Sequence, residues 1–132
     1  MAGSLVISTL NNDTGVLATQ NGMTGICKAW VNYDSRTQTI AGSFNVSSMT
    51  YSAAGTYIMN FTTAMPNANY VAVGGIGKFS PLANDANAAI QFKNATGNSS
   101  GLSTTQLYIS VRTPSGNGAE DYSYVGVSVF SS

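Results

Sequence analysis

The chain has 132 residues, five basic and five acidic side chains, one cysteine and no histidine. This length is typical of one domain whose core needs no disulfide or metal, and the single Cys27 cannot form an intrachain disulfide. The lack of clustered Lys and Arg argues against nucleic-acid binding by phosphate neutralisation. The lack of His excludes Ser-His-Asp and Cys-His catalysis.

Charged residues make up 8% of the chain, against roughly 25% in ordinary soluble domains. Ser, Thr and Asn replace them and account for about a third of the residues. Such a neutral surface suits a protein that packs against other subunits, because little charge is desolvated on association. No basic segment followed by an apolar block opens the chain, and no apolar run reaches the length of a membrane span. We therefore expect neither a signal peptide nor membrane insertion.

Residues 1–24 are predicted to form an N-terminal arm and linker ahead of a domain at 25–132. The stretch SLVISTL at 4–10 has the composition of a short strand, and turn residues follow it. This arm is a candidate for attachment to a larger assembly, by adding a strand to another chain's sheet. An edge strand of the same domain is the alternative. The apolar residues of the arm are Leu5, Val6, Ile7 and Leu10.

Residues 26–33 alternate like a β-strand, with Trp30 on one face. The other face is cleanly apolar and predicts the core side of the strand. Trp is usually largely buried, so we expect Trp30 to pack in the domain core or between subunits. A ligand platform is the alternative. The apolar face carries Cys27, Ala29, Val31 and Tyr33.

A hairpin is predicted after the turn at 34–36. Residues 37–41 start back, residues 43–50 continue as one strand, and a Gly-containing turn at 52–55 leads into a strand at 56–62. On that last strand, one face carries Tyr57, Met59 and Phe61, and the other carries Ile58 and Asn60.

Four further strands are predicted. Residues 69–77 indicate a buried strand, whose paired glycines predict a bulge or a close backbone approach. Strands at 88–94, 104–112 and 122–130 follow, separated by Gly-, Asn- and Ser-rich loops, and no helical period is present. The pattern predicts an all-β, antiparallel, jelly-roll-like sandwich. Alternation puts Leu107, Ile109 and Val111 on one face of the third of these strands, and Val125, Val127 and Val129 on one face of the last.

Three segments carry a resemblance to known proteins: SLVISTL at 4–10, KAWVNYD at 28–34, and SFNVSSMTYSAAGTYIMNFTTAMPNANYVAV at 43–73. In order and spacing they resemble a module found in phage tail fibres and small phage virion proteins, often from phages of marine bacteria and cyanobacteria. The resemblance implies a virion structural protein, commonly a homotrimer, which is assembled in the host cytoplasm with other tail or capsid proteins. It leaves open a fibre or fibre tip that contacts the host surface, a tail adaptor and a capsid decoration protein.

Three loops, at 78–87, 94–101 and 113–121, are candidates for contact with a host glycan. Their amides and hydroxyls match the hydroxyl groups of sugars, and an aromatic side chain can stack on a sugar ring. A purely structural role is the competing hypothesis. The candidate ligand-binding residues are Lys78, Asn84, Asp85, Asn98, Tyr108, Asn117, Glu120 and Asp121.

No pattern in the chain predicts catalysis. Glycoside cleavage needs two carboxyl groups that flank one bond, whereas Glu120 and Asp121 are adjacent in a Gly-rich loop. No loop carries the regularly spaced acidic ligands of a calcium site. We therefore expect neither enzymatic activity, nor a cofactor, nor a bound metal.

Overall fold

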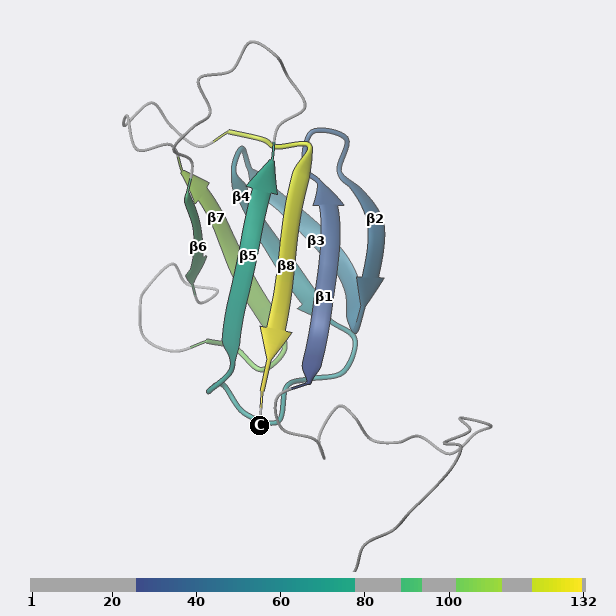
Figure 1. Cartoon of the computed structure of the whole chain (residues 1–132), viewed down its shortest axis with the longest axis vertical. Helices are drawn as coiled ribbons and strands as arrows, with labels where there is room; N and C mark the ends of the chain where they lie inside the picture. The colour runs from purple at the N-terminus through teal and green to yellow at the C-terminus, as the bar shows by residue number, and fades with distance from the viewer. Residues whose placement is uncertain (1–25, 78–88, 94–101, 113–119, 132) are drawn as a thin grey trace, which may run out of the picture.

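The computed structural model describes residues 26–77, 89–93, 102–112 and 120–131. These residues contain eight strands in two four-stranded antiparallel sheets that pack face to face (Figure 1), which confirms the predicted antiparallel β-sandwich. The arm at 1–24 lies outside the described residues. Within the described part of the chain, no helix has the length and hydrophobicity needed to cross a membrane.

The strands are β1 Cys27–Asp34, β2 Thr39–Phe44, β3 Val46–Ala53, β4 Thr56–Phe61, β5 Val71–Gly77, β6 Ala89–Lys93, β7 Gln106–Arg112 and β8 Tyr124–Phe130. Sheet A has the order β2-β1-β8-β5, and sheet B has the order β3-β4-β7-β6. The first and last strands therefore lie side by side in the middle of sheet A.

The core lies between the sheets and is built from the faces that alternation predicted. Period-2 patterning places every second residue of a strand on the same side. In the core, Tyr33 of β1 and Tyr57 of β4 meet edge to face, with ring centroids 5.5 Å apart. The other buried core residues of the predicted faces are Ala29, Val31, Met59, Phe61, Leu107, Ile109, Val111, Val125, Val127 and Val129.

The prediction of one strand over residues 43–50 is wrong, because the chain changes sheets at Asn45. This residue has a φ of 54°, in the left-handed region that Asn tolerates better than most residues. Its side-chain amide donates to the carbonyls of Lys28 and Thr63, both at 3.0 Å, and its Oδ1 accepts the Thr63 N–H at 2.7 Å. Asn45 thus ends β2 in sheet A and lets β3 begin in sheet B.

The prediction that residues 69–77 form a buried strand is also wrong, because β5 is an edge strand of sheet A. Its Val71 is 62% exposed and its Val73 is 49% exposed. An apolar run without alternation does not distinguish a buried strand from an exposed edge. The predicted close approach is confirmed at Gly74, where a Cβ would lie 2.8 Å from the carbonyl oxygen of Gly126. No bulge interrupts the pairing of β5 with β8.

Candidate ligand-binding groove

The outer face of sheet A gathers the exposed large hydrophobic side chains of the described residues. Trp30 pairs with Phe44 on β2 and with Ser128 on β8, and Ser128 pairs in turn with Val73 on β5. The side chains of such a row lie on the same face of a sheet. The exposed large hydrophobic residues are Trp30, Phe44, Val71, Val73 and Tyr124.

Trp30 is 41% exposed, so the prediction that it packs in the domain core is wrong. Its neighbours Ala29 and Val31 are buried on the core side of β1. Alternation along the strand therefore directs the indole to the opposite side. Whether another subunit covers Trp30 is a separate question that stays a prediction.

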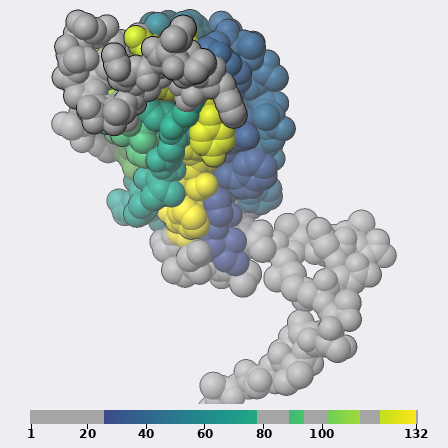
Figure 2. Space-filling model, turned by 45° about the horizontal axis from the view of Figure 1, so that its top comes forward, coloured from purple at the N-terminus to yellow at the C-terminus, as the bar shows by residue number. Residues whose placement is uncertain are grey.

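A row of small residues forms a groove in this face. Asn32 of β1 pairs with Gly42 on one side and with Gly126 on the other, and Gly126 pairs with Gly75. The open groove over β1, β8 and β5 has a volume of about 510 Å³, within the range of small-molecule sites. Figure 2 shows part of this face, with β8 in yellow between β5 in teal and β1 in dark blue.

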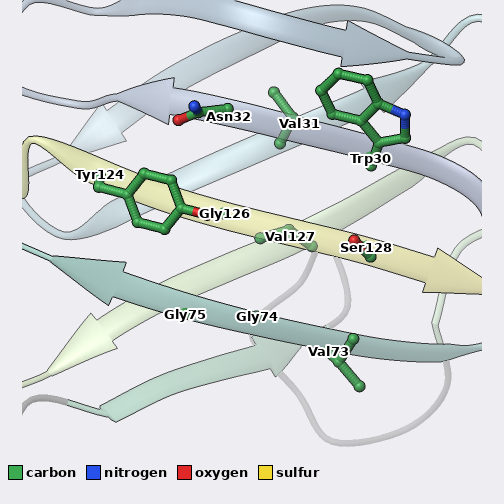
Figure 3. A pocket seen from close by; sticks show the side chains of 10 residues that line it. All are labelled: Trp30, Val31, Asn32, Val73, Gly74, Gly75, Tyr124, Gly126, Val127 and Ser128. Atoms are coloured by element: carbon green, nitrogen blue, oxygen red, sulfur yellow. The ribbon is translucent and has the colours of Figure 1, made fainter.

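Trp30 and Tyr124 stand at opposite ends of the groove (Figure 3). The indole leans over Gly42, where a Cβ would lie 3.2 Å from its Cη2 atom. The Tyr124 ring leans over Gly126, where a Cβ would lie 2.8 Å from the ring carbon Cζ. The two glycines therefore let both rings lie close to the sheet, with their faces available to a ligand.

The groove contains polar side chains that form no hydrogen bond with other described residues. No hydrogen bond joins the indole N–H of Trp30, the amide of Asn32 or the hydroxyls of Tyr124 and Ser128 to any described residue. These groups can donate to and accept from a bound molecule. None of the residues that line the groove is charged. The groove thus suits an uncharged ligand with both hydroxyl groups and an apolar surface.

The outer face of sheet B is different, because its polar side chains bond to one another. The Asn60 amide donates to the hydroxyls of Ser48 at 3.0 Å and Thr50 at 3.1 Å. The Gln106 amide donates to Asn60 Oδ1 at 2.9 Å. These groups satisfy each other, which leaves less hydrogen-bonding capacity for a ligand than in the groove.

Asp121, one of the predicted ligand-binding residues, is bonded within the sandwich. Its carboxylate accepts hydrogen bonds from the hydroxyls of Tyr51 at 2.9 Å and Tyr57 at 2.8 Å, and from the N–H of Gly55 at 3.0 Å. The hydrogen bond to Asp121 raises the pKa of Tyr51, and burial raises the pKa of Tyr57. Asp121 therefore has a structural role, while the adjacent Glu120 is exposed.

Tyr108, another predicted ligand-binding residue, lies on β7, where it pairs with Ile58 and Lys93. Its neighbours Leu107 and Ile109 face the core, so Tyr108 is on the outer face of sheet B. The structure thus separates Tyr108 from both Asp121 and the groove. The remaining predicted ligand-binding residues lie outside the described residues: Lys78, Asn84, Asp85, Asn98 and Asn117. The arm residues Leu5, Val6, Ile7 and Leu10 also lie outside them.

None of the groove residues other than Trp30 was predicted from the sequence as a candidate for ligand contact. One feature of the sequence did indicate an exposed Trp30. In residues 26–33 it shares a face with polar residues, whereas the opposite face is entirely apolar. The row of Gly42, Gly75 and Gly126 gives no such signal, because only strand register brings these three glycines together.

The described residues contain no group of three or more Cys, Asp or Glu side chains that could hold a metal ion. The residues that line the groove offer aromatic rings, an amide and hydroxyls to a ligand. A scan of protein-family models and searches of curated proteins and of solved structures found no match for this chain.

Proposed function

We propose that this chain is a non-enzymatic structural protein of a phage virion, a tail fibre or fibre-tip component that contacts neutral host-surface glycans through the groove of sheet A. The resemblance of residues 4–10, 28–34 and 43–73 to phage appendage modules supports the virion role. The observation that carries the glycan contact is the combination of two exposed aromatic rings with unbonded amide and hydroxyl groups and no charge.

A sugar ring has C–H groups on its faces and hydroxyl groups around its edge. The C–H groups pack on an aromatic face, whose quadrupole is negative, and the hydroxyls need both donors and acceptors. Trp30 and Tyr124 supply the aromatic faces, Asn32 lies along β1 between the two ends of the groove, and Ser128 lies on β8 opposite Trp30. An acidic sugar would find no cationic side chain among the lining residues.

A capsid decoration protein or tail adaptor is the second candidate. The exposed row of Trp30, Phe44 and Val73 favours it, because large exposed apolar patches commonly mark protein contacts. In that function the outer face of sheet A packs against another virion protein and no glycan enters the groove.

An array of neutral and acidic glycans, probed with the labelled full chain, tests the glycan contact. We expect neutral glycans to bind, and Trp30→Ala and Tyr124→Ala to weaken binding by at least about tenfold. Tyr108→Ala on the outer face of sheet B is the matched control and should leave binding unchanged. Each variant should first be shown to unfold at a urea concentration near that of the parent.

Loss of binding in the Tyr108 variant would contradict contact through the groove, and the absence of any binding by the parent would contradict the glycan contact itself. Electron microscopy of particles labelled with antibody to this chain then shows whether the chain lies on the head or on the tail. Label on the head supports the decoration protein. Label on the tail supports the fibre or the tail adaptor, and of these only the fibre should bind glycans on the array.

A further inference from the structure

Sheet A ends in an edge that lacks the usual protection against strand addition. The seven residues of β5 contain no charged residue and no proline, and their register with β8 is continuous. Natural edge strands are normally blunted by charge, proline or a bulge. Within the described part of the chain, β5 pairs with β8 alone. Every second residue of β5 therefore directs its N–H and C=O away from the sheet.

The main chain of this edge is open to solvent. Gly74 and Gly75 are both exposed, and exposure of a glycine is exposure of its backbone. On the inner side, Ile90 and Phe92 of β6 approach Gly74 closely. Among the described residues, β6 covers the inner side of this edge and no strand pairs with the outward side of β5, which is the geometry that an additional strand requires.

We infer that residues 4–10 of a second copy of this chain add to sheet A as a fifth strand beside β5. The segment SLVISTL has the β-branched, uncharged composition that strand addition favours. Its alternation puts Leu5 and Ile7 on one face and Val6 and Leu10 on the other. One face packs toward Ile90 and Phe92, and the other continues the exposed stripe of Val71 and Val73.

The length of the linker favours a second copy over the arm's own sheet. Cys27 pairs with Phe130, and Phe130 pairs with Val71, so β1 and β5 begin at the same end of sheet A, two strand spacings apart. A fifth strand beside β5 would lie three spacings from β1, which is about 15 Å. The linker at 11–24 has 14 residues, which span about 46 Å when extended. A connection from β1 to a fifth strand of the same sheet needs only a few residues. A linker of 14 residues is long enough to reach a neighbouring subunit.

Disulfide trapping between two differently tagged, co-expressed copies tests the pairing. Both copies carry Cys27→Ser, which removes the only native thiol. One copy carries cysteine in turn at each of residues 5–10, and the other carries Val73→Cys. Neighbouring strands bring Cβ atoms within the range that a disulfide can bridge. After mild oxidation, we expect disulfide-linked heterodimers from every second arm position and little product from the positions between them.

Thr50→Cys replaces Val73→Cys in the control, because Thr50 is exposed on the outer face of sheet B. We expect no specific product from this acceptor. A chain that carries both the arm cysteine and Val73→Cys reports pairing within one copy. The inference is overturned by links confined to single chains, by equal linking at all arm positions, by equal linking to Thr50→Cys, or by no link at all.

Discussion

The hydroxyl of Tyr57 donates a hydrogen bond to Oδ1 of Asp121 at 2.8 Å, which joins β4 of sheet B to the segment that leads into β8 of sheet A. Ser35 Oγ lies 2.9 Å from the same tyrosine hydroxyl and accepts the N–H of Tyr122 at 2.8 Å. These contacts connect the two sheets at one end of the sandwich through polar groups, where the apolar core stops.

Removing the Tyr57 hydroxyl should destabilise the fold. We expect Tyr57→Phe to lower the free energy of unfolding by about 1–3 kcal/mol, because it leaves a partly buried carboxylate with one hydrogen bond fewer. Urea unfolding at one fixed protein concentration measures the change. Tyr124→Phe is the control, since its hydroxyl bonds to no described residue, and it should leave stability near the parent's. Equal effects of the two variants would contradict the structural role of Tyr57.

The backbone conformation and the side-chain hydrogen bonds of Asn45, where the chain crosses between the sheets, should contribute separately to the free energy of unfolding. Asn45→Ala loses the side-chain hydrogen bonds to Lys28 and Thr63. It also leaves an alanine at a φ of 54°, without the local hydrogen bonds that let Asn adopt this conformation. We expect it to cost about 2–4 kcal/mol of stability. Asn45→Gly loses the same hydrogen bonds but tolerates the φ, so it should cost less by about 1 kcal/mol. A glycine variant less stable than the alanine variant in urea unfolding would refute this account.

Gly74 and Gly75 are adjacent in β5 but should respond differently to alanine. A Cβ at Gly74 would lie 2.8 Å from the carbonyl oxygen of Gly126, whereas a Cβ at Gly75 meets nothing within 4 Å. We expect Gly74→Ala to cost about 1–3 kcal/mol through overpacking. Gly75→Ala should be neutral or stabilising by less than about 1 kcal/mol. Thermal unfolding of both variants checks the difference, and similar melting temperatures would contradict it.

Alkaline pH should weaken the fold through Tyr70. Its hydroxyl donates to the carbonyls of Ser103 at 2.9 Å and Gln106 at 3.3 Å, and burial raises its pKa from 10.0 to about 12. The unfolded chain therefore releases this proton at lower pH than the folded chain. The stabilisation is complete below pH 10 and is lost as the pH rises toward 12, by at most about 3 kcal/mol. Urea unfolding across this range should show a shallower pH dependence for Tyr70→Phe.

We expect the chain to form a homotrimer in solution. The low charge and the resemblance to trimeric phage modules motivate this prediction, and the exposed apolar face of sheet A offers surface for association. Sedimentation equilibrium at micromolar concentration should give the mass of three chains. A monomer under those conditions would rule the trimer out.

Local patterns predicted the core faces because alternation is a property of a single strand. The inward faces of β4, β7 and β8 follow directly from it, as do the turn residues around Gly55, whose φ is 63°. The break at Asn45 was missed because apolar and polar residues keep alternating through it. The groove could not be found in this way, since Asn32, Gly126 and Gly75 come from three strands and meet only through register. The prediction for Trp30 was wrong because it followed the usual burial of Trp, although alternation placed this residue opposite the apolar face of its strand.

The position of β8 in the middle of sheet A sets the order in which the molecule can be made. Val31 of β1 pairs with Val127 of β8, 96 residues later (127 − 31), and β5 also pairs with β8. A growing chain can pair β3 with β4 as soon as both emerge from the ribosome, but β1 and β5 have no strand between them until residues 124–130 are synthesised. Pairings of such long sequence separation form slowly. Sheet A, and with it the groove, is therefore completed only after translation of β8. Until then, β1 and β5 of the nascent chain each lack the strand that lies between them in the folded protein.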